Sequence, residues 1–473
     1  MAAERLAKQT LLQELPPEGA GELLPAVQDR VRASGSKVVV LDDDPTGTQT
    51  VHNVPLLTEW SIESLCTEFE NDLPAVYLLT NTRSVPLLEA QAINAEVGRN
   101  LTRAAQRTGR DFVVVSRSDS TLRGHFPGEV TALAEALKRE DQSWLIIPSF
   151  FEGGRYTIGD IHYVEEGDEL IPVGESAYAQ DKVFGYRSSN LRHWVEEKTN
   201  GRIRFRDVAS ISLELIRSGG PERVAQRLLN LKPGQVCVIN AAGYRDLEVF
   251  VLGLLAAEAH GQHFLYRTAA SFVRVRAGIP SRPLLTPHEL NVSEPGNGLI
   301  VVGSYVSRTT SQLEALLMDS RVLAVEVKVE ALLDQERRLA EIQGVAASVN
   351  DGLRSSRDVV VYTSRKLIAG GADRNSLLTG QEISKGLVAI VQNLDVRPRY
   401  LLAKGGITAS DIATKALGIR KAMVLGQILP GVPVWLPGPE SRYPGMPYIV
   451  FPGNVGDAQS LIRSTMTLSN RKQ

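Results

Sequence analysis

A chain of 473 residues is too long for one ordinary hydrophobic core, so it predicts two domains. With 43% hydrophobic residues, 22% charged residues and a formal net charge of −2, it has no general electrostatic attraction to nucleic acid or to an anionic membrane. No apolar run reaches the length of a membrane span, and Cys66 and Cys237 lack a metal-type spacing, so we expect reduced thiols in a cytoplasmic protein.

Residues 1–36 predict a helical N-terminal extension before the first strand. Glu4, Glu14, Glu18 and Glu22 lie among its apolar residues, and Pro16 and Pro17 interrupt the segment. One or two amphipathic helices are therefore expected, and the segment has no apolar signal-peptide core.

Three consecutive carboxylates, Asp42, Asp43 and Asp44, directly follow an apolar run of strand length at 38–41. Carboxylates in a row repel one another, so the cluster needs cations, hydrogen bonds or a ligand to compensate it. Ligands of open α/β sheets bind beyond the carboxyl ends of the strands. The stretch therefore predicts one wall of a functional site, the alternative being a solvated acidic turn.

Apolar runs of strand length then alternate with helical patterns, which is typical of parallel sheets built from β-α-β units. The strands are expected at 76–79, 112–115, 144–147, 236–239, 299–302, 359–362, 400–402, 422–425 and 448–451. The helices are expected at 87–106, 129–137, 247–259, 309–317, 381–392 and 409–417. We predict an α/β fold of two domains, each with a mainly parallel sheet flanked by helices.

Two segments break this alternation. Residues 152–187 are rich in Gly, Tyr, Asp and Glu with weak periodicity, and we expect a substrate-facing loop excursion or a hairpin there. Residues 279–298 are rich in proline and glycine and read as an interdomain linker. The domains are therefore expected at 37–278 and 299–473.

Arginines follow the predicted strand ends of the first domain at Arg83, Arg117 and Arg123. Arginine binds carboxylate or phosphate through a two-pronged hydrogen bond, and the hydroxyls of 116–121 with Asp119 suit a polyhydroxy substrate. The alternative is that the arginines only neutralise the aspartates. His125 is a candidate general base, although a structural role is more common for such a histidine.

The second domain has three strand–loop–helix passages rich in small residues. They contain Ser304, the pair Gly405 and Gly406, and Gly453. Backbone N–H groups at such turns bind phosphate, and glycine permits close approach. Three such loops favour a nucleotide-phosphate site over ordinary tight turns, although the chain has neither a Walker A motif nor a GxGxxG sequence.

These segments together resemble the four-carbon acid sugar kinase family. The matching segments are Asp42–Val51, Ser116–His125, Gly303–Gln312, Lys404–Asp411, Gly426–Ser441 and Phe451–Asp457. The resemblance implies a sugar-acid-binding domain at 37–278, a nucleotide-binding domain at 299–473, and ATP-dependent phosphorylation of a threonate-, erythronate- or oxo-tetronate-type acid between them.

The resemblance also implies the site residues. The implied substrate positions are Asp43, Asp44, Arg83, Arg117, Ser118, Asp119, Ser120 and Thr121, with Asp43 and Asp44 as catalytic candidates. The implied ATP positions are Ser304, Gly405, Gly406, Ile407, Thr408, Gly453 and Asn454. Other family members carry an acidic residue where this chain has Ile407. ATP and Mg²⁺ are the expected cofactors, with no magnesium ligand assigned; the expected partners are small molecules, and a homodimer is left open.

Two alternatives remain at this stage. Asp42, Asp44 and Thr46 also match the Asp-x-Asp-x-Thr signature of phosphatases in which the first aspartate attacks phosphorus. A non-catalytic sugar-acid-binding protein is the other. Consumption of ATP with a sugar acid distinguishes the kinase from both.

Overall fold

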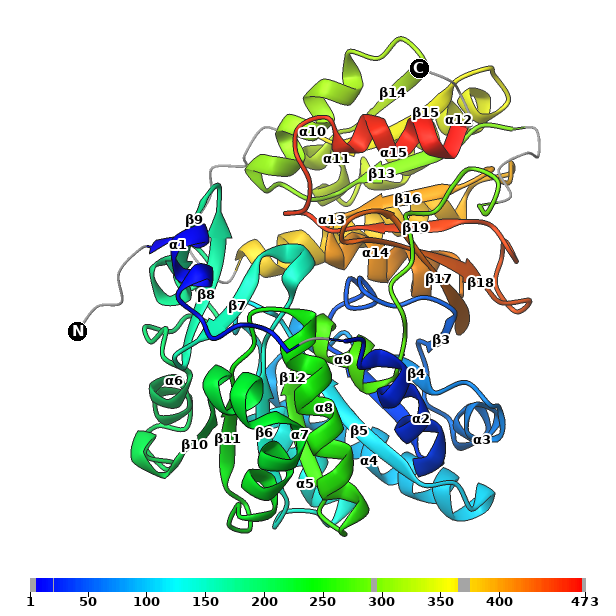
Figure 1. Cartoon of the computed structure of the whole chain (residues 1–473). Helices are drawn as coiled ribbons and strands as arrows, with labels where there is room; N and C mark the ends of the chain where they lie inside the picture. Colours follow the sequence, from blue (N-terminus) through cyan, green and yellow to red (C-terminus); the bar gives the residue numbers. More distant parts are fainter. Residues whose placement is uncertain (1–5, 20, 291–295, 365–374, 470–473) are drawn as a thin grey trace. The chain divides into compact units, whose positions relative to one another are not determined.

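The computed structural model describes residues 6–19, 21–290, 296–364 and 375–469, which form two compact units (Figure 1). The N-terminal unit takes its residues from Met1–Thr50 and Glu59–Ser281, and the C-terminal unit from Val51–Thr58 and Arg282–Gln473. A short segment directly after the aspartate cluster thus belongs to the C-terminal unit. No described helix is both long and apolar enough to cross a bilayer.

The N-terminal unit is built on a parallel sheet with strand order β10-β11-β6-β12-β5-β2-β4. Its strands are β2 (Lys37–Asp42), β4 (Ala75–Leu79), β5 (Phe112–Arg117), β6 (Ser143–Ile147), β10 (Ala209–Ile211), β11 (Val236–Ile239) and β12 (Phe264–Thr268). Every residue of β2 is buried, as expected of a strand covered on both faces.

Helices cover both faces of this sheet (Figure 1). From α2 onward, the helices of this unit are α2 (Leu24–Ser34), α3 (Ile62–Glu70), α4 (Leu87–Thr108), α5 (Gly128–Leu137), α6 (Leu191–Lys198), α7 (Leu213–Leu229), α8 (Tyr244–Ala259) and α9 (Ala270–Arg276). The connections through α4 and α5 run along the sheet in one direction, and those through α7 and α8 run in the other. Right-handed crossovers therefore place these two pairs of helices on opposite faces.

A small antiparallel sheet, ordered β1-β9-β8-β7, completes the N-terminal unit. Its strands are β1 (Leu6–Ala7), β7 (Arg155–Ile158), β8 (Ile161–Glu166) and β9 (Glu169–Pro172), and α1 (Lys8–Gln13) follows β1. Part of the segment at 152–187 is thus the hairpin that the sequence left open. The N-terminal extension contains the expected helices α1 and α2, and also β1, which was not predicted.

The C-terminal unit has a mixed sheet with strand order β3-β17-β18-β19-β16-β13-β15-β14. The pairs from β19 to β14 are parallel, and those joining β3, β17, β18 and β19 are antiparallel. The strands are β3 (Val54–Leu57), β13 (Leu299–Val302), β14 (Val322–Val327), β15 (Asp358–Thr363), β16 (Leu401–Lys404), β17 (Lys421–Leu429), β18 (Val432–Pro437) and β19 (Tyr448–Phe451). The helices are α10 (Ser307–Leu317), α11 (Val329–Leu333), α12 (Arg338–Leu353), α13 (Asn375–Gln392), α14 (Gly406–Asp411), with a π-helical turn at Ile412–Ala416, and α15 (Ser460–Ser469).

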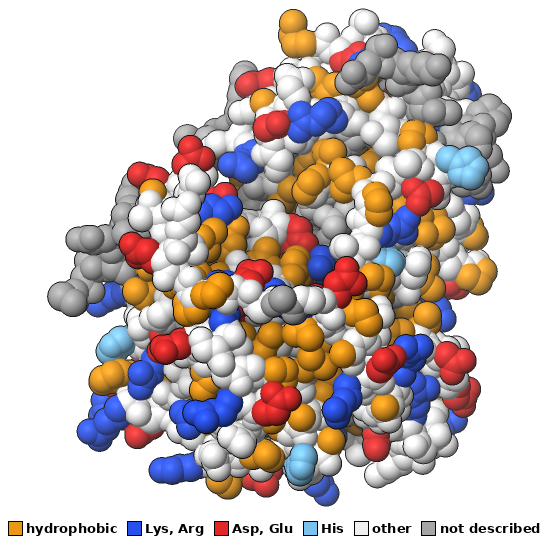
Figure 2. Space-filling model, in the orientation of Figure 1, with side chains coloured by type: hydrophobic (Ala, Val, Ile, Leu, Met, Phe, Trp, Pro, Cys, Tyr) orange, Lys and Arg blue, Asp and Glu red, His pale blue; other side chains and the backbone are white. Residues whose placement is uncertain are grey.

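Both units confirm the predicted fold class, an α/β architecture with mainly parallel sheets. Each strand and each helix expected from periodicity is present, with bounds shifted by a few residues. The strands that were not predicted are β1, β3, β10, β12, β14 and β18, besides the hairpin region. Residues 291–295 of the expected linker lie outside the described residues. On the face drawn in Figure 2, acidic and basic side chains are interspersed, in keeping with the near-neutral net charge.

Candidate functional site

The aspartate cluster lies at the ends of two neighbouring strands of the N-terminal unit whose connections run in opposite directions along the sheet. β2 and β5 pair side by side with Asp42 opposite Arg117. Within the N-terminal unit the next strand after β2 is β4 and the next after β5 is β6, and these two lie on opposite sides of the pair. A reversal of this kind is where open α/β sheets bind ligands. The main chain ties the strand ends together, because Thr80 N–H donates to Asp42 O and Arg83 N–H donates to Asp43 O.

Asp42 is the structural anchor of this cluster. It is fully buried, and Arg117 Nη1 donates a hydrogen bond to its Oδ1 across 3.1 Å. Burial raises the pKa of Asp42 to about 7 despite the opposing effect of Arg117. The turn passes tightly over this side chain: a Cβ on Gly47 would lie 1.9 Å from Asp42 Oδ2, so only glycine fits there. Asp42 is therefore poorly placed to meet a substrate.

Asp43 is buried differently. Arg83 Nη2 lies 3.2 Å and Arg117 Nη1 lies 3.9 Å from its Oδ1. Both of its carboxylate oxygens are buried, and neither accepts a hydrogen bond from the described residues. Burial raises the pKa of Asp43 to about 6, with Arg83 opposing that shift. A carboxylate of this kind has unused acceptor capacity close to neutral pH.

Arg83 is the cation shared by the cluster. Besides Asp43, it contacts Asp44 Oδ2 at 3.1 Å and Asp119 Oδ1 at 3.3 Å. Burial alone would raise the pKa values of Asp44 and Asp119, but Arg83 acting on Asp44, and Arg123 together with Arg83 acting on Asp119, hold both pKa values below the usual range. Arg83, Asp44 and Asp119 keep small exposed fractions of 16%, 22% and 12%, so this side of the cluster is in contact with solvent.

The loop after β5 brings the remaining predicted substrate residues to the same edge. Ser118, Ser120 and Thr121 are nearly buried, and the Thr121 hydroxyl donates to Asp119 Oδ2. This hydrogen bond helps to fix the position of the Asp119 carboxylate. Arg123 Nε also donates to that oxygen, across 2.7 Å.

Two other side chains change the sequence-based interpretation of this edge. His125 Nε2 lies 2.9 Å from the carbonyl oxygen of Val85, and its ring packs edge-on against Phe184. This arrangement is typical of a structural histidine. Asp181, which sequence reasoning missed, lies 3.6 Å from Arg123 Nη1. It comes from the weakly periodic segment, where no pattern singled it out.

The three small-residue loops of the C-terminal unit also come together. They follow the carboxyl ends of neighbouring strands β13, β16 and β19. Gly405 has φ +114° and a Cβ there would lie 3.0 Å from Ser304 Cβ, while a Cβ on Gly453 would lie 3.1 Å from Ser304 Oγ. Thr309 Oγ1 donates to the carbonyl oxygen of Gly453 across 3.0 Å. These contacts place Ser304, Gly405 and Gly453 against one another.

The other predicted nucleotide positions extend this loop cluster. Thr408 is nearly buried against Gly303, whereas Ile407 is 53% exposed. The carbonyl oxygen of Asn454 accepts a hydrogen bond from Arg308 Nη1 across 3.1 Å. Arg308, at the start of α10, was not predicted and brings a positive charge to the same loops.

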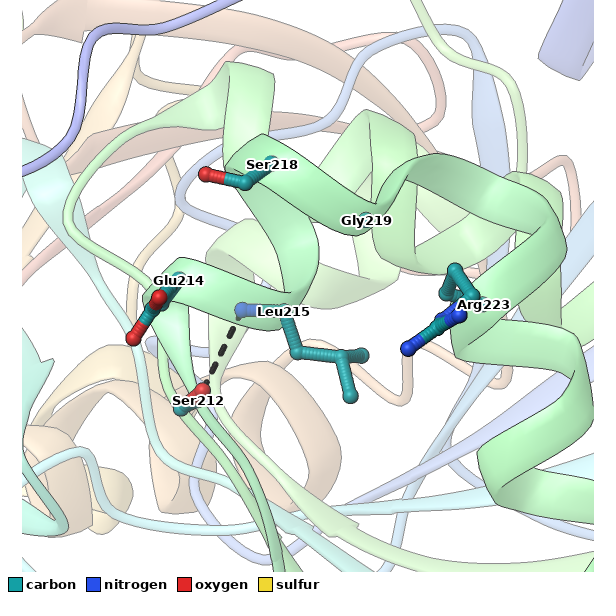
Figure 3. A pocket seen from close by; sticks show the side chains of 6 residues that line it. All are labelled: Ser212, Glu214, Leu215, Ser218, Gly219 and Arg223. Carbon is teal, nitrogen blue, oxygen red and sulfur yellow. Dashed lines mark hydrogen bonds between the residues drawn. The ribbon is translucent and has the colours of Figure 1, made fainter.

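Two further features of the described residues, the possible metal ligands and a surface hollow, do not compete with the aspartate cluster and the small-residue loops as candidate sites. Among the described residues, no group of three or more His, Cys, Asp or Glu side chains is arranged to hold a metal ion. A hollow of 460 Å³ lies on α7, lined by Ser212, Glu214, Leu215, Ser218, Gly219 and Arg223. In Figure 3 Leu215 and Arg223 point toward one another across it. Helix α7 joins β10 to β11 at one edge of the sheet, and several strands separate these two from β2, which carries the aspartate cluster.

Comparison with known proteins shows to which family this chain belongs. Residues 38–276 match the sugar-binding N-terminal domain, and residues 299–461 match the nucleotide-binding C-terminal domain. The chain belongs to the four-carbon acid sugar kinase family. A D-erythronate kinase from Heliobacterium modesticaldum is 26% identical over 340 residues, which cover 69% of this chain and 71% of that protein.

Solved structures support the same fold for this kinase-family chain. A Haemophilus influenzae protein of the DUF1537 family superposes with a TM-score of 0.61 at 17% identity, covering 91% of this chain and 100% of that one. A Salmonella typhimurium LT2 protein, provisionally described as a tRNA synthase, gives a TM-score of 0.67 at 18% identity and covers 90% of this chain and 98% of that one. Residues 1–37 lie outside both domain matches.

Proposed function

We propose that this protein is an ATP-dependent kinase that phosphorylates a hydroxyl group of a four-carbon sugar acid of the threonate, erythronate or oxo-tetronate type. The observation that carries the proposal is Asp43, whose two carboxylate oxygens are buried and accept no hydrogen bond from the described residues, although Arg83 is 3.2 Å away. Such an oxygen suits a substrate hydroxyl. The match to sugar-binding and nucleotide-binding domains and the D-erythronate kinase relative support the substrate class.

In this proposal the N-terminal unit holds the sugar acid. Arg83 binds the substrate carboxylate, because its guanidinium is partly exposed at the sheet edge and its contacts with Asp43, Asp44 and Asp119 hold it in place. Arg117 contributes positive charge from the protein interior, since its side chain is nearly buried and hydrogen-bonded to Asp42. Ser118, Asp119, Ser120 and Thr121 shape the pocket for the remaining hydroxyls.

Asp43 is the better candidate for the catalytic base, with Asp44 as its partner. A base with a pKa near the working pH combines a deprotonated population with useful proton affinity, and burial places the pKa of Asp43 at about 6. Asp44 is held ionised by Arg83 and by hydrogen bonds from Thr46. We assign proton removal from the attacking hydroxyl to Asp43 and orientation of that hydroxyl to Asp44.

The C-terminal unit binds ATP in this proposal. Ser304, Gly405, Gly406, Ile407, Thr408, Gly453 and Asn454 form the phosphate-facing loops, and Arg308 adds positive charge. Small residues allow the main chain to approach the phosphates closely. Mg²⁺ usually keeps water ligands and binds kinase sites largely through the phosphates, which fits loops that offer hydroxyl and backbone groups rather than a carboxylate cluster. When bound, the ion would neutralise phosphate charge.

The phosphatase alternative is weakened by Asp42. That mechanism needs the first aspartate of the signature as a nucleophile, but Asp42 is fully buried, bonded to Arg117 and covered by Gly47. The deciding experiment measures ADP formation with a panel of four-carbon sugar acids. We expect ATP consumption that depends on one of them and falls by about 100-fold or more in Asp43→Asn. Phosphate release from phosphate esters without ATP, with label on the protein lost in Asp42→Asn, would support the phosphatase instead.

A further inference from the structure

The loop of residues 118–123 in the N-terminal unit is held by its main-chain carbonyl groups. Its chain turns tightly, because Leu122 has φ +67° and its N–H donates to Asp119 O across 3.1 Å. A left-handed conformation is costly for leucine unless the surroundings impose it. The carbonyl oxygens of Asp119, Ser120, Thr121 and Arg123 each accept a hydrogen bond from a side chain outside the loop.

Arg267 on β12 holds both ends of this loop. Its Nη1 donates to Asp119 O across 3.2 Å, and its Nη2 donates to Arg123 O across 3.1 Å. The side chain is 1% exposed and lies over the Trp194 ring. A planar guanidinium can span two carbonyl groups in a fixed geometry, and a lysine ammonium cannot reproduce that fork.

His162 on β8 holds the middle of the loop. Its Nε2 lies 2.7 Å from Ser120 O, and its Nδ1 lies 2.9 Å from Thr157 Oγ1. Because a carbonyl oxygen only accepts, Nε2 carries the proton and Nδ1 accepts from the threonine hydroxyl. Burial lowers the pKa of His162 to about 4, which keeps the ring neutral in this arrangement.

Tyr186 supplies the remaining contact. Its hydroxyl donates to Thr121 O across 2.5 Å, and its side chain is buried. Tyr186 and His162 come from the segment that links β6 to α6, so this excursion lies against the predicted substrate loop through defined hydrogen bonds.

We propose that Arg267, His162 and Tyr186 are positioning residues for the sugar-acid site. They fix the main chain of residues 118–123, so that the Asp119 carboxylate stays 3.3 Å from Arg83 and the hydroxyl side chains keep their places. None of the three is assigned contact with substrate. The sugar acid as ligand rests on the proposed function, whereas the fixation of the loop does not.

The decisive variants are His162→Leu and His162→Gln. Leucine removes the donor and leaves a buried carbonyl group unsatisfied, whereas glutamine can place an amide N–H near the same point. We expect His162→Leu to raise KM for the sugar acid about tenfold, with KM for ATP within about twofold of wild type, and His162→Gln to recover most of the loss. Tyr186→Phe, which removes a single hydroxyl, should act in the same direction more weakly.

A matched pair of buried arginines separates positioning from general destabilisation. Arg267→Lys should raise KM for the sugar acid, while Arg276→Lys removes an equally buried arginine that instead pairs with Glu258 at 2.8 Å. Both changes should lower stability, but only the first should change the sugar-acid KM. Equal KM effects in the two variants would overturn the proposal.

Hydrogen exchange provides a readout that does not depend on activity. The amides of Ser118 and Leu122 donate to Thr268 O and Asp119 O, and they should exchange faster in Arg267→Lys and His162→Leu while the β2 amides stay protected. Unchanged exchange in the loop, or faster exchange without a change in sugar-acid KM, would contradict the positioning role. A wild-type protein that turned over no four-carbon sugar acid would contradict the proposed function, and the exchange result would still show whether these side chains hold the loop.

Discussion

Arg117 and Asp42 face each other across paired strands, with Nη1 3.1 Å from Oδ1 and both side chains almost completely buried. At the same sheet edge Arg83 is more open, with 16% of its side chain exposed, whereas its partner Asp43 is 4% exposed but has two carboxylate oxygens that accept no hydrogen bond from the described residues. The cluster therefore contains an inner ion pair, which is structural, and an outer pair, which can serve a ligand. This division gives the four acidic and basic groups different expected mutational effects.

Removing the inner pair's carboxylate should cost stability. Asp42→Ala removes the only carboxylate that is hydrogen-bonded to the buried Arg117 among the described residues, with Asp43 left 3.9 Å away, and breaking a buried pair in this way costs up to roughly 3–5 kcal/mol of unfolding free energy. Urea unfolding followed by tryptophan fluorescence measures this, since Trp60, Trp144 and Trp194 lie in the N-terminal unit. The control is Asp29→Ala, which removes the exposed pair with Arg32 and should cost about 1 kcal/mol or less. Similar losses in both variants would show that the inner pair is not specially stabilising.

The pH profile should identify the base. Asp43 has a pKa raised to about 6 by burial and must be deprotonated to accept the hydroxyl proton. We therefore expect kcat/KM for the sugar acid to fall as pH decreases through about 6 and to level off above it. Asp43→Asn should be slow and should lose this inflection, whereas Asp44→Asn should keep it, because Asp44 is already ionised over that range. An unchanged inflection in Asp43→Asn would assign it to another group.

The strand ends of this site could be predicted from the sequence because each is marked by a local residue pattern. A continuous apolar run followed by Asp42, Asp43 and Asp44 predicts a buried strand with its acidic end at a sheet edge, and Arg83 and Arg117 follow strands of the same type. The structure brings these side chains within ion-pair distance. Their roles in binding and catalysis stay predictions.

The side chains and strands that support the site were not predicted from the sequence, for reasons that differ from one to the next. β12 was missed because a buried charge, Arg267, interrupts its apolar run. β14 could have been found, because Val322–Val327 begins with four apolar residues in a row, although its side chains are largely half-buried or exposed in the fold. His162 and Tyr186 act on carbonyl groups far away in sequence, and a hydrogen bond to main chain leaves no residue pattern. The placement of Val51–Thr58 in the C-terminal unit depends on β3 pairing with β17, which is a tertiary contact.

Arg83→Lys should separate geometry from charge in substrate binding. The guanidinium contacts Asp43, Asp44 and Asp119 at once, and an ammonium group cannot match that spread. We expect KM for the sugar acid to rise about tenfold or more while KM for ATP stays near wild type. Steady-state kinetics with each substrate varied in turn tests this. Normal values for both substrates would remove Arg83 from the pocket.

Substitution of Gly405 should weaken nucleotide binding selectively. A side chain at φ +114° is strained, and a Cβ would lie 3.0 Å from Ser304. Gly405→Ala should therefore displace the loops and reduce ATP affinity by about tenfold or more in calorimetry, while sugar-acid binding persists. The control is Gly344→Ala in α12, where a Cβ meets no atom within 4 Å and helix propensity favours alanine. Unchanged ATP affinity in a folded Gly405→Ala variant would remove this loop from the nucleotide site.

The N-terminal extension should stabilise the small antiparallel sheet. β1 pairs with β9, and Lys8 Nζ lies 2.8 Å from Glu165 on β8. Three leucines of the extension pack against the cluster of Tyr156, Ile158, Tyr163, Leu170 and Leu213: Leu11, Leu12 and Leu15. Further along the extension, Arg217 Nη1 donates to the carbonyl oxygen of Pro16 across 2.7 Å.

Leu12→Ser with Leu15→Ser should therefore lower the unfolding free energy of the N-terminal unit by roughly 1–3 kcal/mol, since each leucine loses part of its buried apolar area. Because β8 also carries His162, the double variant should speed hydrogen exchange at β8 and, to a smaller extent, at residues 118–122. The matched control is Leu339→Ser, which changes an exposed leucine on α12 and should alter neither measurement. Faster exchange at β8 without any change at 118–122 would show that the extension supports the hairpin but does not reach the substrate loop.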